Sequence, residues 1–360
     1  MTIDIERLVR KNIRNLRPYS SARSEFTGVA EVFLDANENA FGSPAGGEFN
    51  RYPDPLQMEL KRRLAPIKNV EVSQIFVGNG SDEAIDLLFR IFCEPGRDEV
   101  IICPPTYGMY RVSADINDVA VREVRLTDDF NLDVQNVISS IRNNTKLIFL
   151  CSPNNPTGNL MRRESIVEIT QAFNGMVIVD EAYLDYSDSP SMTAELAALP
   201  NLVILQTFSK AWGMAALRIG LALANETVIE LLNRVKPPYN VSGIAQQAVI
   251  DALENAETVA NWIAVSTGQR NGLSTAFTGF SFVRKVYPSD ANFILVKVDD
   301  ADAAYRFLLN EKIVVRDRSN VELCGGCLRI TVGTPEENQR LIGSFVRIEE
   351  RFATNEAITR

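Results

Sequence analysis

The sequence predicts an α/β protein in which helices cover both faces of a mostly parallel sheet, together with a smaller α+β domain. Short, continuously apolar segments alternate with segments of helical pattern through the middle of the chain, which is typical of parallel sheets. The alternation ends near Lys236-Pro-Pro-Tyr239, and strands and helices then mix without strict order. A length of 360 residues also favours two domains.

The expected strands of the larger domain are short apolar runs. They cover residues 75–78, 100–103, 121–126, 146–151, 176–180, 202–206 and 218–223. Helical patterns lie between them at residues 82–92, 107–117, 163–173 and 226–235. Runs without a polar face indicate strands that are buried on both sides, so we expect helices above and below this sheet.

The rest of the chain predicts the smaller domain. Helices are expected near residues 244–275, at 301–310 and after 333, and strands at 282–287, 291–298, 314–317 and 328–333. The expected parts are an N-terminal arm of residues 1–35 that joins the small domain, a large domain of residues 36–240, and a small C-terminal domain of residues 241–360.

Charge and composition exclude several classes of function. The chain carries 37 Lys and Arg against 46 Asp and Glu, a net charge of −9, so a nucleic-acid partner is not expected. The first residues, MTIDIERLVRKNIRNLR, are polar and charged, and no apolar run approaches the length of a membrane span. We therefore expect a cytoplasmic protein without a membrane partner.

The chain contains no histidine, which excludes Ser-His-Asp and Cys-His nucleophiles and histidine-bound metals. Cys324-Gly-Gly-Cys327 has the spacing of a redox or zinc pair, but zinc would need two more ligands. We expect reduced cytosolic thiols and no metal. Proton transfer then falls to Lys, Tyr, Cys, a carboxylate or a cofactor.

Two turns at strand ends could bind a small ligand. Gly78-Asn-Gly-Ser-Asp-Glu83 joins a strand to a helix, where free N–H groups bind phosphate; an ordinary capped turn is the alternative. Ser152-Pro-Asn-Asn155-Pro-Thr-Gly158 places the Asn155 amide at the carboxyl edge of the sheet, where α/β proteins bind ligands. This turn could also exist without a function.

Two charged residues follow later strands. Asp180 ends an apolar strand, so its carboxylate is either a solvated strand end or a partner that keeps a pyridine nitrogen protonated, worth about 1.5–3 kcal/mol. Lys210 follows one strand–helix unit later, in Thr207-Phe-Ser209-Lys210, and Arg218 comes shortly after it. Lysine forms Schiff bases with carbonyl cofactors, although a lysine past a strand can simply be exposed.

In this order the four segments resemble the fold-type I pyridoxal-phosphate aminotransferases, and the resemblance extends over essentially the whole chain. It implies pyridoxal 5′-phosphate as the cofactor and Lys210 as the catalytic lysine that forms a Schiff base with it. Asp180 would pair with the ring nitrogen, and Tyr107 would stack on the ring. Asn155 and Tyr183 would bind the ring oxygen. The residues implied for the cofactor phosphate are Ser81, Asp82, Ser209 and Arg218, with Thr207 as a further contact.

Other segments resemble the histidinol-phosphate branch of this family. They are Leu16-Arg-Pro-Tyr19-Ser-Ser-Ala-Arg23, Leu34-Asp-Ala-Asn37-Glu-Asn39, Arg51-Tyr52-Pro53, Phe92-Cys-Glu-Pro-Gly96, Val314-Val-Arg316-Asp317 and Cys327-Leu-Arg329-Ile-Thr-Val-Gly333. The resemblance implies a homodimer with shared active sites, in which Tyr52 reaches the cofactor phosphate of the neighbouring subunit. It also implies substrate contacts by Tyr19, Asn37, Arg316 and Arg329.

An arginine pair suits such small-molecule substrates, because a guanidinium fork fits a carboxylate and a phosphate alike; ordinary charged strand ends are the alternative. The implied reaction transfers an amino group between L-histidinol phosphate and 2-oxoglutarate. An aromatic aminotransferase or a threonine-phosphate decarboxylase of the same fold is the nearest alternative. A cofactor-sensing regulator and a nucleotide-binding protein are more distant ones.

Overall fold

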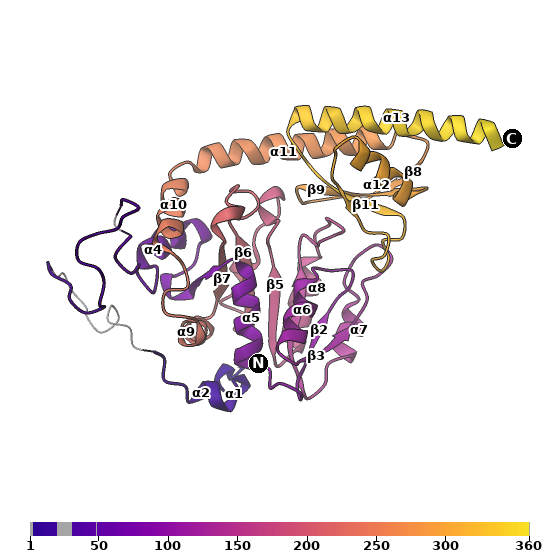
Figure 1. The fold of residues 1–360 in the computed structure, drawn as a ribbon. Coiled ribbons are helices and arrows are strands. Elements are labelled where there is room, and N and C mark those ends of the chain that lie inside the picture. Colours follow the sequence, from indigo (N-terminus) through magenta and orange to yellow (C-terminus); the bar gives the residue numbers. More distant parts are fainter. Residues whose placement is uncertain (1–2, 20–30, 48, 360) are drawn as a thin grey trace.

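A seven-stranded sheet organises the larger part of the protein (Figure 1). The computed structural model describes residues 3–19, 31–47 and 49–359. Within this sheet β7 runs antiparallel to both of its neighbours, whereas the other adjacent pairs are parallel. The predicted α/β class with a mostly parallel sheet is confirmed. Across the sheet the strands are β1 (Ile75–Asn79), β7 (Ile219–Ala224), β6 (Leu202–Thr207), β5 (Met176–Asp180), β4 (Thr145–Cys151), β2 (Glu99–Ile102) and β3 (Ala120–Glu123).

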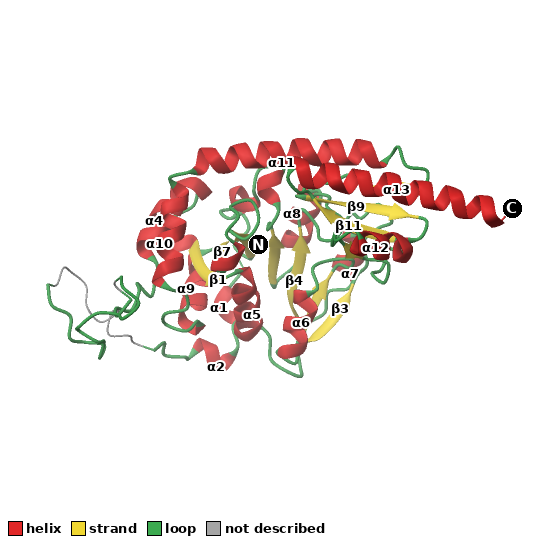
Figure 2. Ribbon diagram, turned by 45° about the horizontal axis from the view of Figure 1, so that its top comes forward, coloured by secondary structure: helices red, strands yellow, loops and turns green. Residues whose placement is uncertain are grey.

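Alternate residues of each central strand enter two separate cores. Val177 and Val179 of β5 belong to one core and Ile178 to the other, because successive side chains of a strand point to opposite faces. Figure 2 shows the helices that cover the sheet. The first core is closed by α4 (Met58–Lys68), α7 (Val134–Ser139), α8 (Arg163–Ala172) and α10 (Gly243–Leu253), and the second by α5 (Ser81–Phe92), α6 (Met109–Ile116) and α9 (Glu226–Val235).

The smaller part is built on a four-stranded antiparallel sheet. Its strands are β10 (Arg316–Asp317), β11 (Cys327–Thr331), β9 (Phe293–Val298) and β8 (Val283–Val286), in that order. The helices of this part are α11 (Ala256–Phe277), α12 (Ala301–Asn310) and α13 (Pro335–Thr359). α11 and α13 lie side by side in Figures 1 and 2, and the rings of Phe277 and Phe345 stack between them at 4.3 Å.

Two expectations for the second half of the chain need correction. The expected helix at 244–275 is interrupted at Glu254 and Asn255, because α10 packs on α4 of the larger part whereas α11 continues to the small sheet. α10 therefore lies with the larger part although it follows residue 240. The exact domain boundaries stay a prediction.

The N-terminal segment packs on the larger part. α1 (Ile5–Leu8) and α2 (Lys11–Arg14) lie beside α5 and α9, and the backbone N–H of Arg10 donates to the carbonyl of Ile91 at 2.9 Å. The expectation that residues 1–35 join the small domain is therefore wrong for this segment. Its regularly spaced apolar side chains match a hydrophobic surface of the large domain; they are Ile5, Val9 and Ile13.

Three further features bear on function. No helix of the described residues is both long and apolar enough to cross a membrane. Within residues 3–19, 31–47 and 49–359, no group of three or more Cys, Asp and Glu side chains is placed to hold a metal ion. All five cysteines are free and buried. Burial raises the pKa of Cys324 to about 12 and that of Cys327 to about 11, so both thiols stay protonated at neutral pH.

Candidate active site

One cavity opens at the carboxyl edge of the larger sheet. The parallel strands β4, β5 and β6 end there and deliver Cys151, Asp180 and Thr207 to its wall. The structure thereby brings together all the cofactor residues that were predicted within one chain. These are Ser81, Asp82, Tyr107, Asn155, Asp180, Tyr183, Thr207, Ser209, Lys210 and Arg218, with Cys151 and Ala182 completing the lining.

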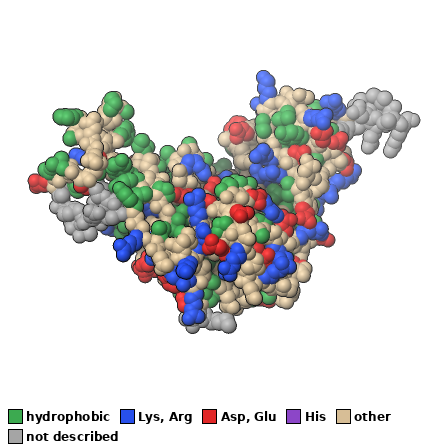
Figure 3. Space-filling model, turned by 60° about the horizontal axis from the view of Figure 1, so that its bottom comes forward, with side chains coloured by type: hydrophobic (Ala, Val, Ile, Leu, Met, Phe, Trp, Pro, Cys, Tyr) green, Lys and Arg blue, Asp and Glu red, His purple; other side chains and the backbone are tan. Residues whose placement is uncertain are grey.

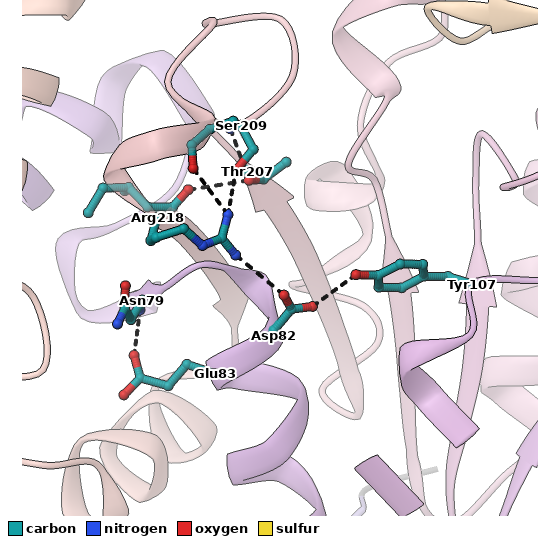
Figure 4. Close-up of polar contacts among 9 residues, drawn as sticks. Asn79, Asp82, Glu83, Tyr107, Thr207, Ser209 and Arg218 are labelled. Atoms are coloured by element: carbon teal, nitrogen blue, oxygen red, sulfur yellow. Dashed lines mark hydrogen bonds and ion pairs between the residues drawn. The ribbon is translucent and has the colours of Figure 1, made fainter. Parts of the chain in front are cut away.

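An anion cradle forms at the N-terminus of α5 (Figure 4). The first N–H groups of a helix have no partner within the helix, and they attract anions. The Arg218 guanidinium lies against this turn, where Nη1 donates to Ser209 Oγ at 3.3 Å and Nη2 pairs with Asp82 Oδ2 at 3.4 Å. A Cβ atom at residue 80 would lie 2.6 Å from Arg218 Nη2. Gly80 therefore allows a guanidinium, a hydroxyl and backbone N–H groups to converge on one anion.

Polar contacts from behind hold the cradle in shape. The Glu83 carboxylate accepts hydrogen bonds from the backbone N–H of Asn79 and, at 2.9 Å, from Asn240 Nδ2. Asn240 Nδ2 also donates to the carbonyl of Val77 at 3.0 Å. Arg218 itself adopts a left-handed conformation with φ 56°, which is uncommon outside glycine and typical of functional sites.

Asp180 presents a buried carboxylate at the floor of the cavity. Oδ1 accepts a hydrogen bond from the Ala182 N–H at 3.0 Å, and Oδ2 accepts one from Tyr110 Oη at 2.8 Å. Burial raises the pKa of Asp180 from 3.8 to about 6, although these two hydrogen bonds and the charge of Lys210 oppose the rise. Such a carboxylate is well suited to share a proton with a ring nitrogen.

Lys210 lines the same cavity, and the charge of Asp180 acts on it. Its Nζ lies 5.4 Å from the centroid of the Tyr183 ring. Burial lowers the pKa of Lys210, and the positive charge of Arg329 adds to this effect. A lysine with a lowered pKa has a larger neutral fraction and serves as a nucleophile or a base. Asn155 Nδ2 donates to Tyr183 Oη at 3.5 Å, so an amide and a phenol lie together for a ligand oxygen.

A second cationic site lies at the edge of the smaller sheet. Arg316 and Arg329 stand directly opposite each other on β10 and β11, so their side chains share one face. Arg318 lies two residues after Arg316, and its N–H donates to the carbonyl of Cys327 at 2.9 Å. Arg329 Nη1 reaches the cavity and donates to Asn155 Oδ1.

Within residues 3–19, 31–47 and 49–359, no ion pair joins these three arginines to a carboxylate, although the charge of Asp317 acts on Arg318. Burial lowers the pKa of Arg329, and the charges of Arg318 and Arg316 lower it further. Like charges directly opposite each other on a sheet cost stability, so this arrangement calls for an anionic ligand.

Five predicted residues do not line the cavity of their own chain, and one of these, Arg329, contacts its wall through the hydrogen bond to Asn155. Arg316 stands opposite Arg329 on the neighbouring strand of the small sheet, and Tyr19 follows α2. Asn37 and Tyr52 belong to residues 31–47 and 49–57 ahead of α4, which we call the projecting arm. Tyr52 is 51% exposed, and its ring stacks on that of Tyr239 at 4.4 Å. Its backbone N–H donates to Glu38 at 2.7 Å, which fixes its place on the arm.

Sequence reasoning missed three residues around the site: Tyr110, Cys151 and Arg318. Tyr110 follows Tyr107 by three residues, the spacing that places two side chains on the same side of a helical turn. Arg318 follows Arg316 by two residues, the spacing of one face of a strand. Cys151 is simply the last residue of an apolar strand, and no sequence signal distinguishes it from a core residue.

A doubly covered α/β sheet with a lysine, a buried carboxylate and an anion cradle at its carboxyl edge defines a class of enzymes that bind a phosphorylated carbonyl cofactor. The chain belongs to the family Aminotransferase class I and II, whose model matches residues 19–345. Enzymes of this family use pyridoxal phosphate.

Individual relatives narrow this further. The chain is 52% identical over 342 residues to the histidinol-phosphate aminotransferase of Parabacteroides distasonis, covering 95% of this chain and 98% of the relative. It is 49% identical over 342 residues to the enzyme of the same name from Cytophaga hutchinsonii, with the same coverage. The crystal structure of histidinol-phosphate aminotransferase from Sinorhizobium meliloti in complex with pyridoxal-5′-phosphate shares the fold, with a TM-score of 0.79, 24% identity and coverage of 88% of this chain and 90% of that one.

Proposed function

We propose that this protein is a histidinol-phosphate aminotransferase, which transfers an amino group between L-histidinol phosphate and 2-oxoglutarate in histidine biosynthesis. The observation that carries the proposal is the pair of anion sites around Lys210. Arg218 marks the cradle on one side and Arg329 the arginine cluster on the other, and both charges act on the pKa of Lys210. One site suits a cofactor phosphate and the other a substrate anion.

The cavity fits pyridoxal 5′-phosphate. When bound, this cofactor supplies an aldehyde that condenses with amines and a ring that accepts electrons when its nitrogen is protonated. The cradle of Gly80, Ser209 and Arg218 would hold the phosphate, and Tyr107 would cover the ring. Asp180 would hold the proton on the ring nitrogen.

Lys210 carries the proton transfer. Its lowered pKa favours the neutral amine, so Nζ can take a proton from the substrate carbon that bears the amino group. Asn155 and Tyr183 would orient the ligand by binding one ring oxygen. The side-chain oxygen of Asn155 accepts a hydrogen bond from Arg329, so the residues that hold cofactor and substrate are directly connected.

The arginine cluster accounts for two chemically different substrates. Glutamate presents a carboxylate and histidinol phosphate a phosphate, and a guanidinium fork binds either one with two hydrogen bonds. Arg329 lies at the cavity, whereas Arg316 stands opposite it on the outer strand. A phosphate dianion can engage both, and a carboxylate is served by Arg329 alone.

We infer further that the protein acts as a homodimer with shared active sites. The projecting arm presents large apolar side chains to solvent, including Phe41 at 102% and Leu34 at 85% exposure. Figure 3 shows hydrophobic side chains gathered on this projecting arm. A second copy of the chain would cover them and would place Tyr52 near the neighbouring cradle.

A cytoplasmic location fits the five free thiols.

A panel of amino donors tests the proposed function. The purified protein is loaded with pyridoxal 5′-phosphate and offered L-histidinol phosphate, phenylalanine, tyrosine or threonine phosphate with 2-oxoglutarate. We expect glutamate formation with a kcat/KM for histidinol phosphate at least roughly tenfold above the others, because one charged hydrogen bond is worth about 1.5 kcal/mol or more.

Lysine variants provide the control for this assay. Lys210→Ala should lose both the visible absorbance of the bound cofactor and turnover, whereas Lys285→Ala, on β8 of the small sheet, should keep both. Equal rates with phenylalanine or tyrosine would replace the proposed substrate by an aromatic one. Release of carbon dioxide from threonine phosphate, without formation of glutamate, would show that the protein is a decarboxylase and not an aminotransferase.

A further inference from the structure

Tyr110 lies directly behind the Asp180 carboxylate. It is completely buried on α6, where its ring stacks on that of Phe149 at 4.8 Å and meets the edge of Tyr107 at 5.5 Å. Its Oη donates to Asp180 Oδ2 at 2.8 Å. Tyr110 is not part of the cavity wall, so it contacts the residues that bind a ligand and not the ligand itself.

The two oxygens of Asp180 are held differently. Oδ1 accepts the N–H of Ala182, a residue of the cavity wall, whereas Oδ2 accepts the phenol of Tyr110 in the interior. Burial raises the pKa of Tyr110 well above its ordinary value, so the phenol stays protonated and acts as a donor. A donor of this kind stabilises the ionised carboxylate, which burial alone disfavours.

We propose that Tyr110 is a positioning residue that keeps the Asp180 carboxylate ionised through Oδ2 and leaves Oδ1 for the ring nitrogen of the cofactor. This inference rests on the proposed function, because it assigns a role around the same cofactor. Among the charged groups near Asp180, Lys210 favours the ionised form and Asp82 opposes it. The phenol adds a neutral donor that binds Oδ2 directly.

Tyr110→Phe separates the hydroxyl from the ring. The phenylalanine ring can still stack on Phe149 and support Tyr107, while Asp180 Oδ2 loses its donor. The wild type and the variant are loaded with pyridoxal 5′-phosphate carrying ¹⁵N in the ring, and the nitrogen chemical shift reports whether that nitrogen is protonated. Exchange of the Cα hydrogen of glutamate in D₂O reports the proton-transfer step.

We expect the wild type to show a protonated ring nitrogen, and the variant to move toward the unprotonated shift. Cα hydrogen exchange should slow roughly ten- to a hundredfold, the effect of losing a hydrogen bond to a charged group. Tyr186→Phe is the matched control, because it removes another buried hydroxyl, one that pairs with Asn292. It should leave both readouts unchanged.

Two results would overturn the inference. One is a wild type that binds the cofactor with a protonated nitrogen while Tyr110→Phe gives the same nitrogen shift and exchange rate; the proposed function would then stand without this role. The other is a wild type that binds no pyridoxal phosphate, which would contradict both the proposed function and the role of Tyr110. If Tyr110→Phe does not fold, 3-fluorotyrosine at position 110 keeps the hydroxyl as a stronger donor to Asp180, and it should change the pH at which the ring nitrogen loses its proton; an unchanged titration counts against the role.

Discussion

Gly80 offers a direct test of the anion cradle. This residue has φ 78° and ψ 166°, a conformation that residues with a side chain rarely adopt. It also packs against Arg218, since an added Cβ atom would lie 2.6 Å from Nη2 and 3.3 Å from Cζ. The substitution Gly80→Ala therefore strains the backbone and pushes the guanidinium out of the cradle.

These two effects act on different quantities. Backbone strain of this kind costs about 1–3 kcal/mol, and it lowers the free energy of unfolding whether or not a ligand is bound. Displacement of Arg218 removes one charged hydrogen bond to a phosphate, worth about 1.5–3 kcal/mol. The dissociation constant for pyridoxal 5′-phosphate should therefore rise roughly ten- to a hundredfold.

Gly96→Ala separates the two effects. Gly96 also has a positive φ, 66°, but it lies beyond the far end of α5, and the nearest atom to an added Cβ is Asp118 Oδ2 at 3.3 Å. This control should lose stability and keep its cofactor affinity. Absorbance titration with pyridoxal 5′-phosphate and denaturant unfolding measure the two quantities. Unchanged cofactor affinity in Gly80→Ala would show that Arg218 and this turn do not form the phosphate site.

Four further substitutions test the remaining assignments. Arg316→Met should lower kcat/KM for histidinol phosphate roughly ten- to a hundredfold and affect glutamate less, whereas Arg329→Met should impair both; equal losses in Arg316→Met contradict this division. Burial raises the pKa of Asp180 from its ordinary value of 3.8 to about 6 in the folded protein. The free energy of unfolding therefore falls as the pH rises from about 4 to 6, because the unfolded chain releases this proton more easily. Asp180→Asn should therefore raise the unfolding free energy of the cofactor-free protein by up to about 3 kcal/mol near pH 8 and change it little near pH 3; equal effects at both pH values contradict this. Tyr52→Phe should weaken cofactor retention without abolishing turnover, and a fully active monomer in sedimentation contradicts the shared site.

The cofactor cavity could be predicted because its residues follow strand ends. Asp180 and Thr207 end their strands, while Ser81 and Lys210 follow theirs within a few residues. Parallel strands end at one edge of a sheet, so residues far apart in the chain meet there without any knowledge of side-chain packing. The order of the strands decides which of these residues are neighbours, and the residue types themselves, a carboxylate, a lysine and hydroxyl groups, indicate the chemistry.

The features that were missed depend on tertiary packing. Tyr110 reaches Asp180 because α6 sets its ring against Phe149 of β4, and neither contact is encoded in the spacing of polar residues. The N-terminal segment was assigned to the wrong domain for a similar reason. The spacing of its apolar residues predicts that it packs against another part of the protein. The sequence does not say which part, because the surface beside α5 and α9 forms only when the chain has folded.

Local placement of charge, and not the net charge, decides which ligands this protein accepts. The net charge of −9 disfavours anions at long range. Lys210 nevertheless lies within the influence of Arg218 on one side and of Arg329 on the other. A pair of unit charges about 4 Å apart interacts roughly four times more strongly at an effective dielectric of about 20 than in water. Two or three guanidinium groups at a partly buried cavity therefore outweigh acidic groups dispersed over a solvated surface. A small phosphorylated substrate is drawn to the cavity, while a polyanion would also meet the acidic exterior.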